Sequence, residues 1–265
     1  MRKLLSYIIF VFLLSLSYSC KYQKLLKSSD SKLKYEKANE YFDKKDYARA
    51  ETLYEQLLSV FRGTAKGEEV AYKRAYCTYY NKDYIMAGAR FRRFAMLYPN
   101  NEHAKESRFM SAYCYYLDAP KSSLDQEFTN KAIREFDLYV GKYPKDEKIE
   151  ECNKIIDELR DKLEDKSYNN AILYYKMGHY LAATIALSNS LKDFPDSKHK
   201  EDIMFYIVKS HYKFAALSVY SKKRERLENA LRAYKKFDRT FSDSKHSKEL
   251  KRIHGNIKKA LAEFG

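Results

Sequence analysis

The sequence predicts an all-α protein, an α-solenoid of about five consecutive helical hairpins. Its 265 residues include only seven Gly and four Pro, far below the roughly 7% and 5% of average proteins, so few tight β-turns are available. A second observation is a short motif that recurs along the chain. A third is a run of apolar residues at helical spacing behind each copy of that motif. Together these observations indicate repeated pairs of helices.

The N-terminal residues have the layout of an export signal. Arg2 and Lys3 precede an apolar stretch at 4–16, and small residues lead from there to Cys20. The apolar stretch is shorter than the about 20 residues that a membrane-spanning helix needs. We therefore expect the segment to be removed after export.

The segment Leu16-Ser-Tyr-Ser-Cys20 resembles the lipobox of bacterial lipoproteins, in which the cysteine is acylated and becomes the first mature residue. This resemblance predicts a lipoprotein signal peptide at 1–19, lipid attachment at Cys20 and a lipidated linker at 20–31. The residues after Cys20 include no acidic run, which favours an anchor that faces the periplasm. An ordinary secretory signal with an incidental cysteine is the alternative.

The recurring motif is Lys45-Asp-Tyr-Ala-Arg-Ala50, which returns as Lys82-Asp-Tyr-Ile-Met-Ala87 and as Gly178-His-Tyr-Leu-Ala-Ala183. An amphipathic helix follows each copy. Such helices end near an aromatic residue that is usually followed by proline, at Tyr98-Pro99, Tyr143-Pro144, Phe194-Pro195 and, without proline, Phe241-Ser242. Each unit is therefore predicted to be two helices and a turn.

These units resemble the tetratricopeptide repeat, which has small residues at positions 8 and 20 where its two helices approach closely. The corresponding pairs are Ala38 and Ala50, Ala75 and Ala87, Ala112 and Ala132, Ala171 and Ala183, and Ser210 and Ala230. Position 24, which fills the gap to the next helix, is occupied by Tyr54, Phe91, Phe136, Leu187 and Tyr234. We expect the repeats to form one solenoid over residues 32–265.

Two units are longer than the standard repeat. The third has an insertion within Asp118–Thr129 and the fifth has one around Ser218–Leu227, and we expect both on loops. Apolar residues at helical spacing in the run Asp146–Lys166 predict that the first helix of unit four is unusually long.

The first helix of each hairpin lines the concave side of such a solenoid, and positions 5, 9 and 12 lie on one stripe. The stripe consists of Tyr35, Asn39, Phe42, Tyr72, Tyr76, Tyr79, Phe109, Tyr113, Tyr116, Tyr168, Ile172, Tyr175, Ile207, His211 and Phe214. Tyrosine offers a large apolar body with a polar tip at low entropic cost. The stripe is therefore a candidate peptide- or protein-binding surface. The alternative is that the same side chains pack within and between repeats.

Other classes of function find little support in the sequence. No GxGxxG or P-loop motif, no HExxH and no Cys/His cluster occurs, so we expect no cofactor, no metal and no catalytic residue. Cys77 and Cys114 occupy matching places in their repeats and are predicted to be buried. The net charge of +15 falls to +13 when Arg2 and Lys3 leave with the signal. Acids and bases are interspersed, so most charges are expected on solvated helix faces and nucleic acid is not an expected partner.

The signal, the lipid-acceptor cysteine and the five repeats together resemble the BamD family, lipoproteins of the outer-membrane β-barrel assembly (BAM) complex. Residues Leu159-Arg-Asp-Lys-Leu163 with Ala171, Tyr174 and Tyr175 are similar to the long central helix of that family. The aromatic-Pro turns are similar too. The segment Ser123-Leu-Asp-Gln126 with Thr129 resembles the inserted loop of its Bacteroidetes branch.

The resemblance implies a non-enzymatic scaffold, lipid-anchored at the periplasmic face of the outer membrane. Its implied partners are a BamA-type barrel protein, other subunits of the assembly complex and unfolded outer-membrane protein precursors. By the same resemblance, the units from Tyr35 to about Tyr116 contact precursors, and those from about Tyr168 to Phe241 dock the barrel protein. The alternative function is a periplasmic repeat lipoprotein that serves as an adaptor in envelope division or peptidoglycan synthesis.

Overall fold

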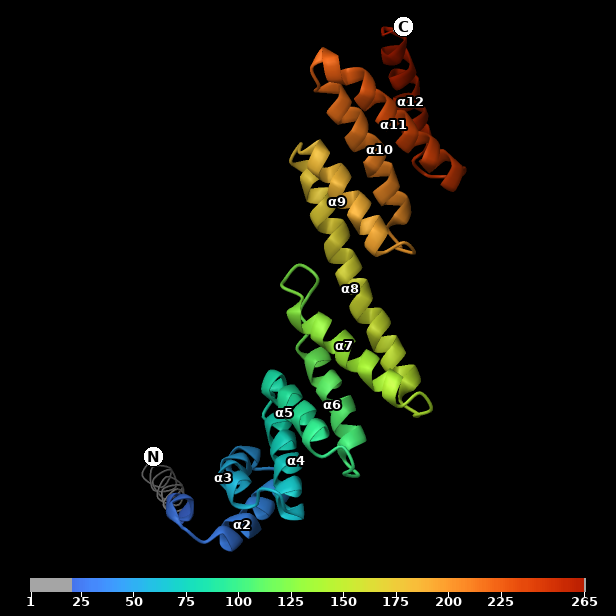
Figure 1. The fold of residues 1–265 in the computed structure, drawn as a ribbon. Coiled ribbons are helices and arrows are strands. Elements are labelled where there is room, and N and C mark those ends of the chain that lie inside the picture. The colour runs from blue at the N-terminus through green and yellow to red at the C-terminus, as the bar shows by residue number, and fades with distance from the viewer. Residues whose placement is uncertain (1–20, 265) are drawn as a thin grey trace, which may run out of the picture. The chain divides into compact units, whose positions relative to one another are not determined.

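A computed structural model describes residues 21–264, and these residues form helices with no strand. The helices follow one another as packed antiparallel hairpins (Figure 1). Residues 21–27 are helical, and the helices after them are α2 (Ser31–Asp43), α3 (Tyr47–Val60), α4 (Ala65–Tyr80), α5 (Tyr84–Leu97), α6 (Ala104–Leu117), α7 (Glu127–Lys142), α8 (Ile149–Lys176), α9 (Tyr180–Asp193), α10 (Lys200–Ala216), α11 (Tyr220–Thr240) and α12 (Ser247–Ala262). The predicted all-α class and the repeated hairpins are confirmed.

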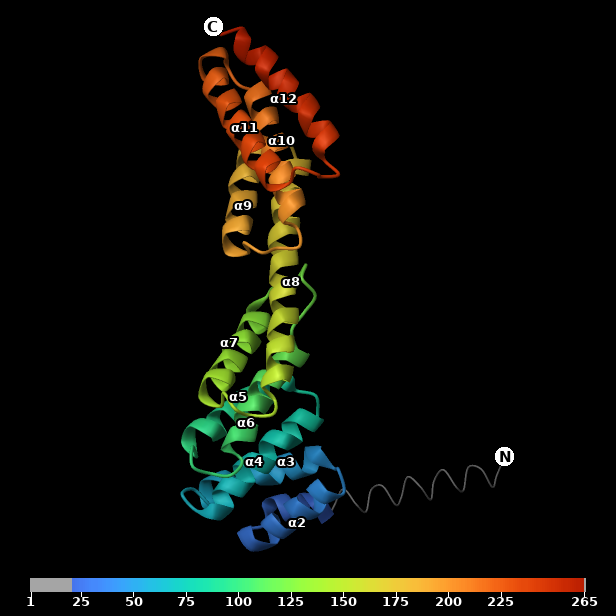
Figure 2. The same cartoon turned by 90° about the vertical axis from the view of Figure 1, so that its right-hand side faces the viewer.

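Contacts divide the described chain into two compact units. Unit 1 consists of residues 21–120 and 126–156, and unit 2 consists of residues 121–125 and 157–264. Helix α8 contributes its first residues to unit 1 and the rest to unit 2. In unit 2, α10, α11 and α12 lie side by side (Figure 2). The single solenoid over 32–265 stays a prediction.

The small residues lie where the helices of each hairpin meet. All ten members of the predicted pairs are buried, with at most 1% of their surface exposed. The residues at position 24 are buried as well, and the most exposed of them, Tyr234, shows only 6% of its surface. The absence of bulk at the helix crossing therefore sets the spacing of the first four hairpins, and an aromatic or leucine side chain closes the gap to the next.

The recurring motif marks the turn inside a hairpin. Lys45, Lys82 and Gly178 all adopt a positive φ, of 61°, 65° and 80°. The residue that follows is the N-cap of the second helix, and the carboxylate of Asp83 accepts a hydrogen bond from the Met86 backbone N–H at 3.1 Å. This bond satisfies one of the N–H groups that a helix start leaves unpaired.

A different joint connects one hairpin to the next. The histidine before the following helix stacks on an aromatic ring of the preceding first helix, with centroids 4.0 Å apart for Tyr72 and His103, 4.2 Å for Tyr168 and His199, and 3.8 Å for Phe205 and His246. In the turn between α7 and α8 Lys148 takes the place of histidine, and its Nζ lies 4.5 Å from the centroid of Phe109. All three histidines thus lie at turns between hairpins.

The two insertions differ in structure. The insertion of the third unit is a loop between α6 and α7, as expected. The loop predicted for the fifth unit is wrong, because only residues 217–219 separate α10 from α11. The extra residues instead lengthen α11 at its N-terminal end, where Leu227 is buried and gives the added turns a packed face. The long helix of unit four is confirmed by α8, which has 28 residues.

Residues 21–27 also depart from expectation. A linker was predicted there, but the segment is helical and packs against the first hairpin. The ring of Tyr22 meets that of Tyr41 edge to face at 5.7 Å, and its hydroxyl donates to the Arg49 carbonyl oxygen at 3.2 Å. Leu25 and Leu26 join the same core. Burial of these three side chains explains why so short a segment is helical.

Candidate functional site

The predicted binding stripe is neither open nor fully buried. Of its fifteen members Phe109 and Ile172 are buried, and the other thirteen are half-buried: Tyr35, Asn39, Phe42, Tyr72, Tyr76, Tyr79, Tyr113, Tyr116, Tyr168, Tyr175, Ile207, His211 and Phe214. Each of these side chains therefore shares its surface between the fold and its surroundings. Binding by the stripe stays a prediction.

The residues at position 5 pack mainly against the next repeat. Tyr35 and Tyr72 each donate a hydrogen bond to a glutamate of the following first helix, Glu69 and Glu106 respectively, the latter at 2.6 Å. Burial and the hydrogen bond to Glu106 raise the pKa of Tyr72. Burial likewise raises the pKa of Tyr168 to about 12. These rings hold neighbouring repeats together.

Position 9 continues this pattern with polar contacts. Asn39 accepts hydrogen bonds from the Tyr54 hydroxyl at 2.7 Å and from Lys73 Nζ at 2.9 Å. Tyr76 donates to Glu106, the same carboxylate that Tyr72 uses. One acid thus joins two tyrosines of α4 to α6.

Two tyrosines of the stripe in unit 1 differ from these, because no protein group in the described residues bonds to their hydroxyls. The ring of Tyr79 on α4 lies 6.3 Å from that of Tyr76, and the ring of Tyr113 on α6 lies 5.7 Å from that of Phe109. Tyr79 also packs against the core that contains Ala87. We call Tyr79 and Tyr113 the tyrosine pair. Within unit 1 they offer half-buried rings and unsatisfied hydroxyls, which is the chemistry that a peptide partner requires.

In the fifth repeat the sequence register is wrong by two residues. The ring that stacks on the turn histidine is Phe205, not the predicted Ile207. Both Val208 and Ser210 are fully buried, so the small residue Ser210 misled the alignment. Ile207 and His211 lie instead beside a cavity on the opposite face of α10.

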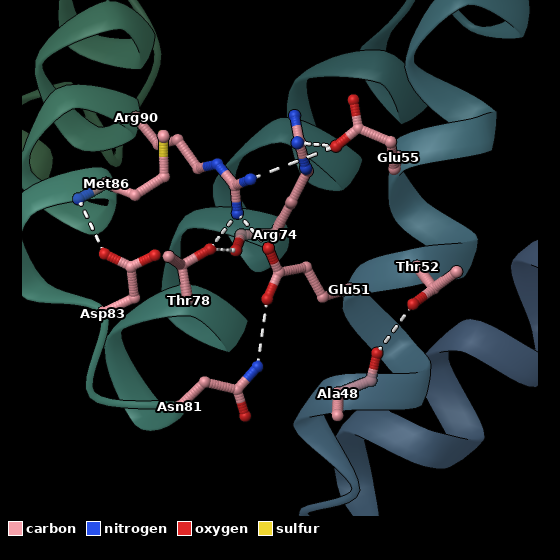
Figure 3. Close-up of polar contacts among 10 residues, drawn as sticks. All are labelled: Ala48, Glu51, Thr52, Glu55, Arg74, Thr78, Asn81, Asp83, Met86 and Arg90. Carbon is pink, nitrogen blue, oxygen red and sulfur yellow. Dashed lines mark hydrogen bonds and ion pairs between the residues drawn. The ribbon is translucent and has the colours of Figure 1, made fainter.

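A partly buried charge network in unit 1 was not anticipated (Figure 3). Arg74 on α4 pairs with Glu55 on α3, and Arg90 on α5 bonds to Glu51 of α3 and to the Thr78 hydroxyl of α4. Only 15% of the Arg74 side chain and 19% of the Arg90 side chain are exposed. We call this set, which joins side chains of α3, α4 and α5, the arginine plug.

Burial and the neighbouring Arg90 lower the pKa of Arg74 to about 10, so it stays charged at neutral pH. Sequence reasoning missed the plug because it placed interspersed charges on solvated faces. The signal in the sequence that could have revealed the plug is the position of the two arginines within the repeat. Both arginines lie one residue before a buried position of the repeat, Arg74 before Ala75 and Arg90 before Phe91.

The remaining predicted sites are structural or lie outside the described residues. Cys77, Cys114 and Cys152 are free thiols and fully buried, which confirms the prediction for the first two, and burial raises the pKa of Cys77 to about 12. Cys20 lies outside residues 21–264. Within that range no three His, Cys, Asp or Glu side chains gather as they do around a metal ion. No described helix combines the length and apolar composition of a membrane span.

Comparison with known proteins identifies the family. A family model described as YfiO, outer membrane lipoprotein, matches residues 27–227. A search of the curated proteins found no match. Because the family model spans well over half of the chain, and the repeats within it have the helical hairpins described above, the protein belongs to the YfiO family of outer membrane lipoproteins, which includes BamD.

Proposed function

We propose that this protein is a non-enzymatic, lipid-anchored subunit of the β-barrel assembly machinery. It would be held through Cys20 at the periplasmic face of the outer membrane, bind a BamA-type barrel protein and other subunits of the complex, and receive unfolded outer-membrane protein precursors. The observation that carries the proposal is the family match over residues 27–227. The loop at 123–126, which resembles that of Bacteroidetes relatives, supports the narrower assignment to that branch.

The tyrosine pair supports a role in binding polypeptides. An unfolded precursor presents apolar side chains and unpaired backbone groups, and a tyrosine ring with a free hydroxyl contacts both kinds of group. Tyr79 and Tyr113 are half-buried, so they give up little rotamer freedom when a partner binds. We therefore assign precursor contact to this part of unit 1.

Depletion in the parent bacterium tests the general function. We expect barrel proteins of the outer membrane to decrease broadly, and a BamA-type protein to copurify with the intact chain from crosslinked envelopes. Normal barrel insertion after depletion, with a primary defect in septation, would instead assign the protein to envelope division.

Site-specific photocrosslinking tests the tyrosine pair. A photoreactive phenylalanine analogue at position 79 or 113 is expected to form adducts with barrel precursors. The matched control places the analogue at Tyr220, which is exposed in unit 2. Equal adduct yields at all three positions would show that contact is unspecific.

A further inference from the structure

Unit 2 contains a cavity of about 320 Å³ between α9, α10 and α11. Its lining consists of Ser188 and Leu191 from α9, Met204, Ile207 and His211 from α10, and Asn229, Arg232, Ala233 and Lys236 from α11. We call it the α9–α11 groove. Its volume lies at the lower end of the roughly 300–1,000 Å³ typical of ligand sites.

The groove is the counterpart of the site that the arginine plug fills in unit 1. Tyr180 and Phe205 are as far apart in sequence as Tyr47 and Tyr72, so α9 and α10 repeat α3 and α4 residue by residue. The stacked pairs Phe205–His246 and Tyr72–His103 confirm this register.

The same register shows why the groove in unit 2 is open. Ile207 stands where unit 1 has Arg74, and Ser188 stands where it has Glu55. Since Ala230 and His246 are spaced like Ala87 and His103, Ala233 on α11 replaces Arg90. The side chains at these three positions are shorter than their counterparts in the plug and carry no charge.

The electrostatic character changes as well. The nine lining residues include no acid, whereas two glutamates belong to the plug. Arg232 bonds only to the neighbouring Asn229, and Lys236 Nζ has no partner among residues 21–264. Two cations without a carboxylate therefore flank an apolar floor of Leu191, Met204 and Ile207, and such a rim attracts an anionic group.

The polar groups of the lining favour a peptide over a lipid. His211 makes no hydrogen bond in the described structure. Its burial, together with the charge of Arg232, lowers its pKa, so the neutral ring offers one donor and one acceptor. Ser188 and Asn229 add a hydroxyl and an amide. Such groups satisfy a peptide backbone, whereas an acyl chain has nothing to bond to them.

We propose that the α9–α11 groove binds a peptide segment that inserts one large apolar side chain between α9 and α11 and places an adjacent carboxylate against Arg232 and Lys236. Residues Ile207 and His211 lie on the face of α10 opposite Phe205, because residues two apart point to opposite sides of a helix. Once the stripe is moved to its correct register on α10, the groove lies on a different face of that helix, and the proposal does not depend on the assembly function.

Methyl NMR of the mature chain tests the proposal, with Met204 as the reporter because its side chain forms part of the groove floor. The Met204 signal is assigned from its loss in Met204→Leu. The probe is the peptide acetyl-Gly-Phe-Glu-Gly-amide. Matched peptides carry Gln for Glu or Ser for Phe. Saturable shifts of the Met204 methyl are expected with the parent peptide, with binding about tenfold weaker for each matched peptide.

Variants of the chain supply the controls. Arg232→Gln with Lys236→Gln, both on the exposed rim, is expected to weaken binding of the parent peptide about tenfold. Thr184→Glu with Ala233→Arg copies the Glu51–Arg90 pair of unit 1 and is expected to abolish the shift. Arg93→Gln, at the unit 1 counterpart of Lys236, is expected to leave binding unchanged.

Several results would overturn the proposal. One is an unshifted Met204 signal with every peptide, and another is equal affinity for the Glu and Gln peptides. A third is a Met204 shift with phosphatidylglycerol vesicles and none with the peptides, which would make the ligand a lipid anion. Should the two-residue filled variant fail to fold, the rim variant still decides the outcome.

Discussion

Replacing His199 by alanine removes the contacts that join the α8–α9 hairpin to α10. The imidazole stacks on Tyr168 with the planes 6° apart, and its Nε2 donates to Asp165 Oδ1 at 2.7 Å. An aromatic pair such as this one contributes about 1 kcal/mol to the free energy of unfolding. The hydrogen bond adds about 1 kcal/mol, at the low end for a charged acceptor because Asp165 is 36% exposed.

The two contributions predict that His199→Ala lowers the free energy of unfolding by about 2 kcal/mol. Urea denaturation followed by circular dichroism measures this change. His179→Ala is the matched control, because His179 is also an N-cap residue but is exposed and makes no cap hydrogen bond. His199→Phe keeps the stacking and should recover about half of the loss. Equal stability of the alanine variants at 179 and 199 would refute the role assigned to the joint.

Three further predictions concern packing, backbone conformation and pH. Ala87→Leu places extra volume at a fully buried helix crossing and should destabilise the protein by about 1–3 kcal/mol. Its control, Ala89→Leu on the exposed side of α5, should change stability by less than about 0.5 kcal/mol. Similar melting temperatures for the two variants would contradict this prediction. Lys82 has a φ of 65°, which costs an L-residue about 1–2 kcal/mol, and Lys82→Gly removes this strain. Because glycine also has more conformational entropy in the unfolded chain, the free energy of unfolding should rise by only about 0.5–1 kcal/mol. A lower urea midpoint for the variant would disprove this. Burial raises the pKa of Asp202, but hydrogen bonds from His246 and Lys245 outweigh burial, so the net effect is a lowered pKa in the folded protein. The ionised carboxylate therefore stabilises the fold at a pH above its unfolded pKa of about 3.9. This stabilisation is lost as the pH falls through the folded pKa. Asp202→Asn should accordingly cost more stability at pH 7 than at pH 3, and equal costs would count against the assignment.

Much of each hairpin follows from local sequence. Ala50 and Ala87 mark helix crossings because no larger side chain fits there. The motif beginning at Lys45 or Lys82 marks a turn because its aspartate is the N-cap immediately before the helix. The length of α8 follows from apolar residues that keep helical spacing without interruption. These are short-range constraints that one sequence displays directly.

What escaped prediction depends on tertiary contact. The helix at 21–27 forms because Tyr22 and Leu25 find a partner surface on the first hairpin, which no local pattern reveals. The added turns of α11 look like a loop insertion until Leu227 is seen to be buried. In the candidate site, the stripe was placed two residues out of register on α10, and the sharing of Glu106 by two tyrosines and the openness of the α9–α11 groove arise from side chains of several repeats together.

The packed helix at 21–27 determines how far the first hairpin can lie from a lipid anchor at Cys20. With acyl chains on Cys20, a single peptide bond separates the anchoring residue from a helix docked on the first hairpin, and no slack chain intervenes. That hairpin would remain within a few residues' length of the lipid surface rather than sweep a wide periplasmic volume. A partner of this hairpin would then bind it close to the bilayer. A flexible Gly/Ser insert between Cys20 and the helix at 21–27 would let the hairpin move farther from the membrane and would remove its fixed distance.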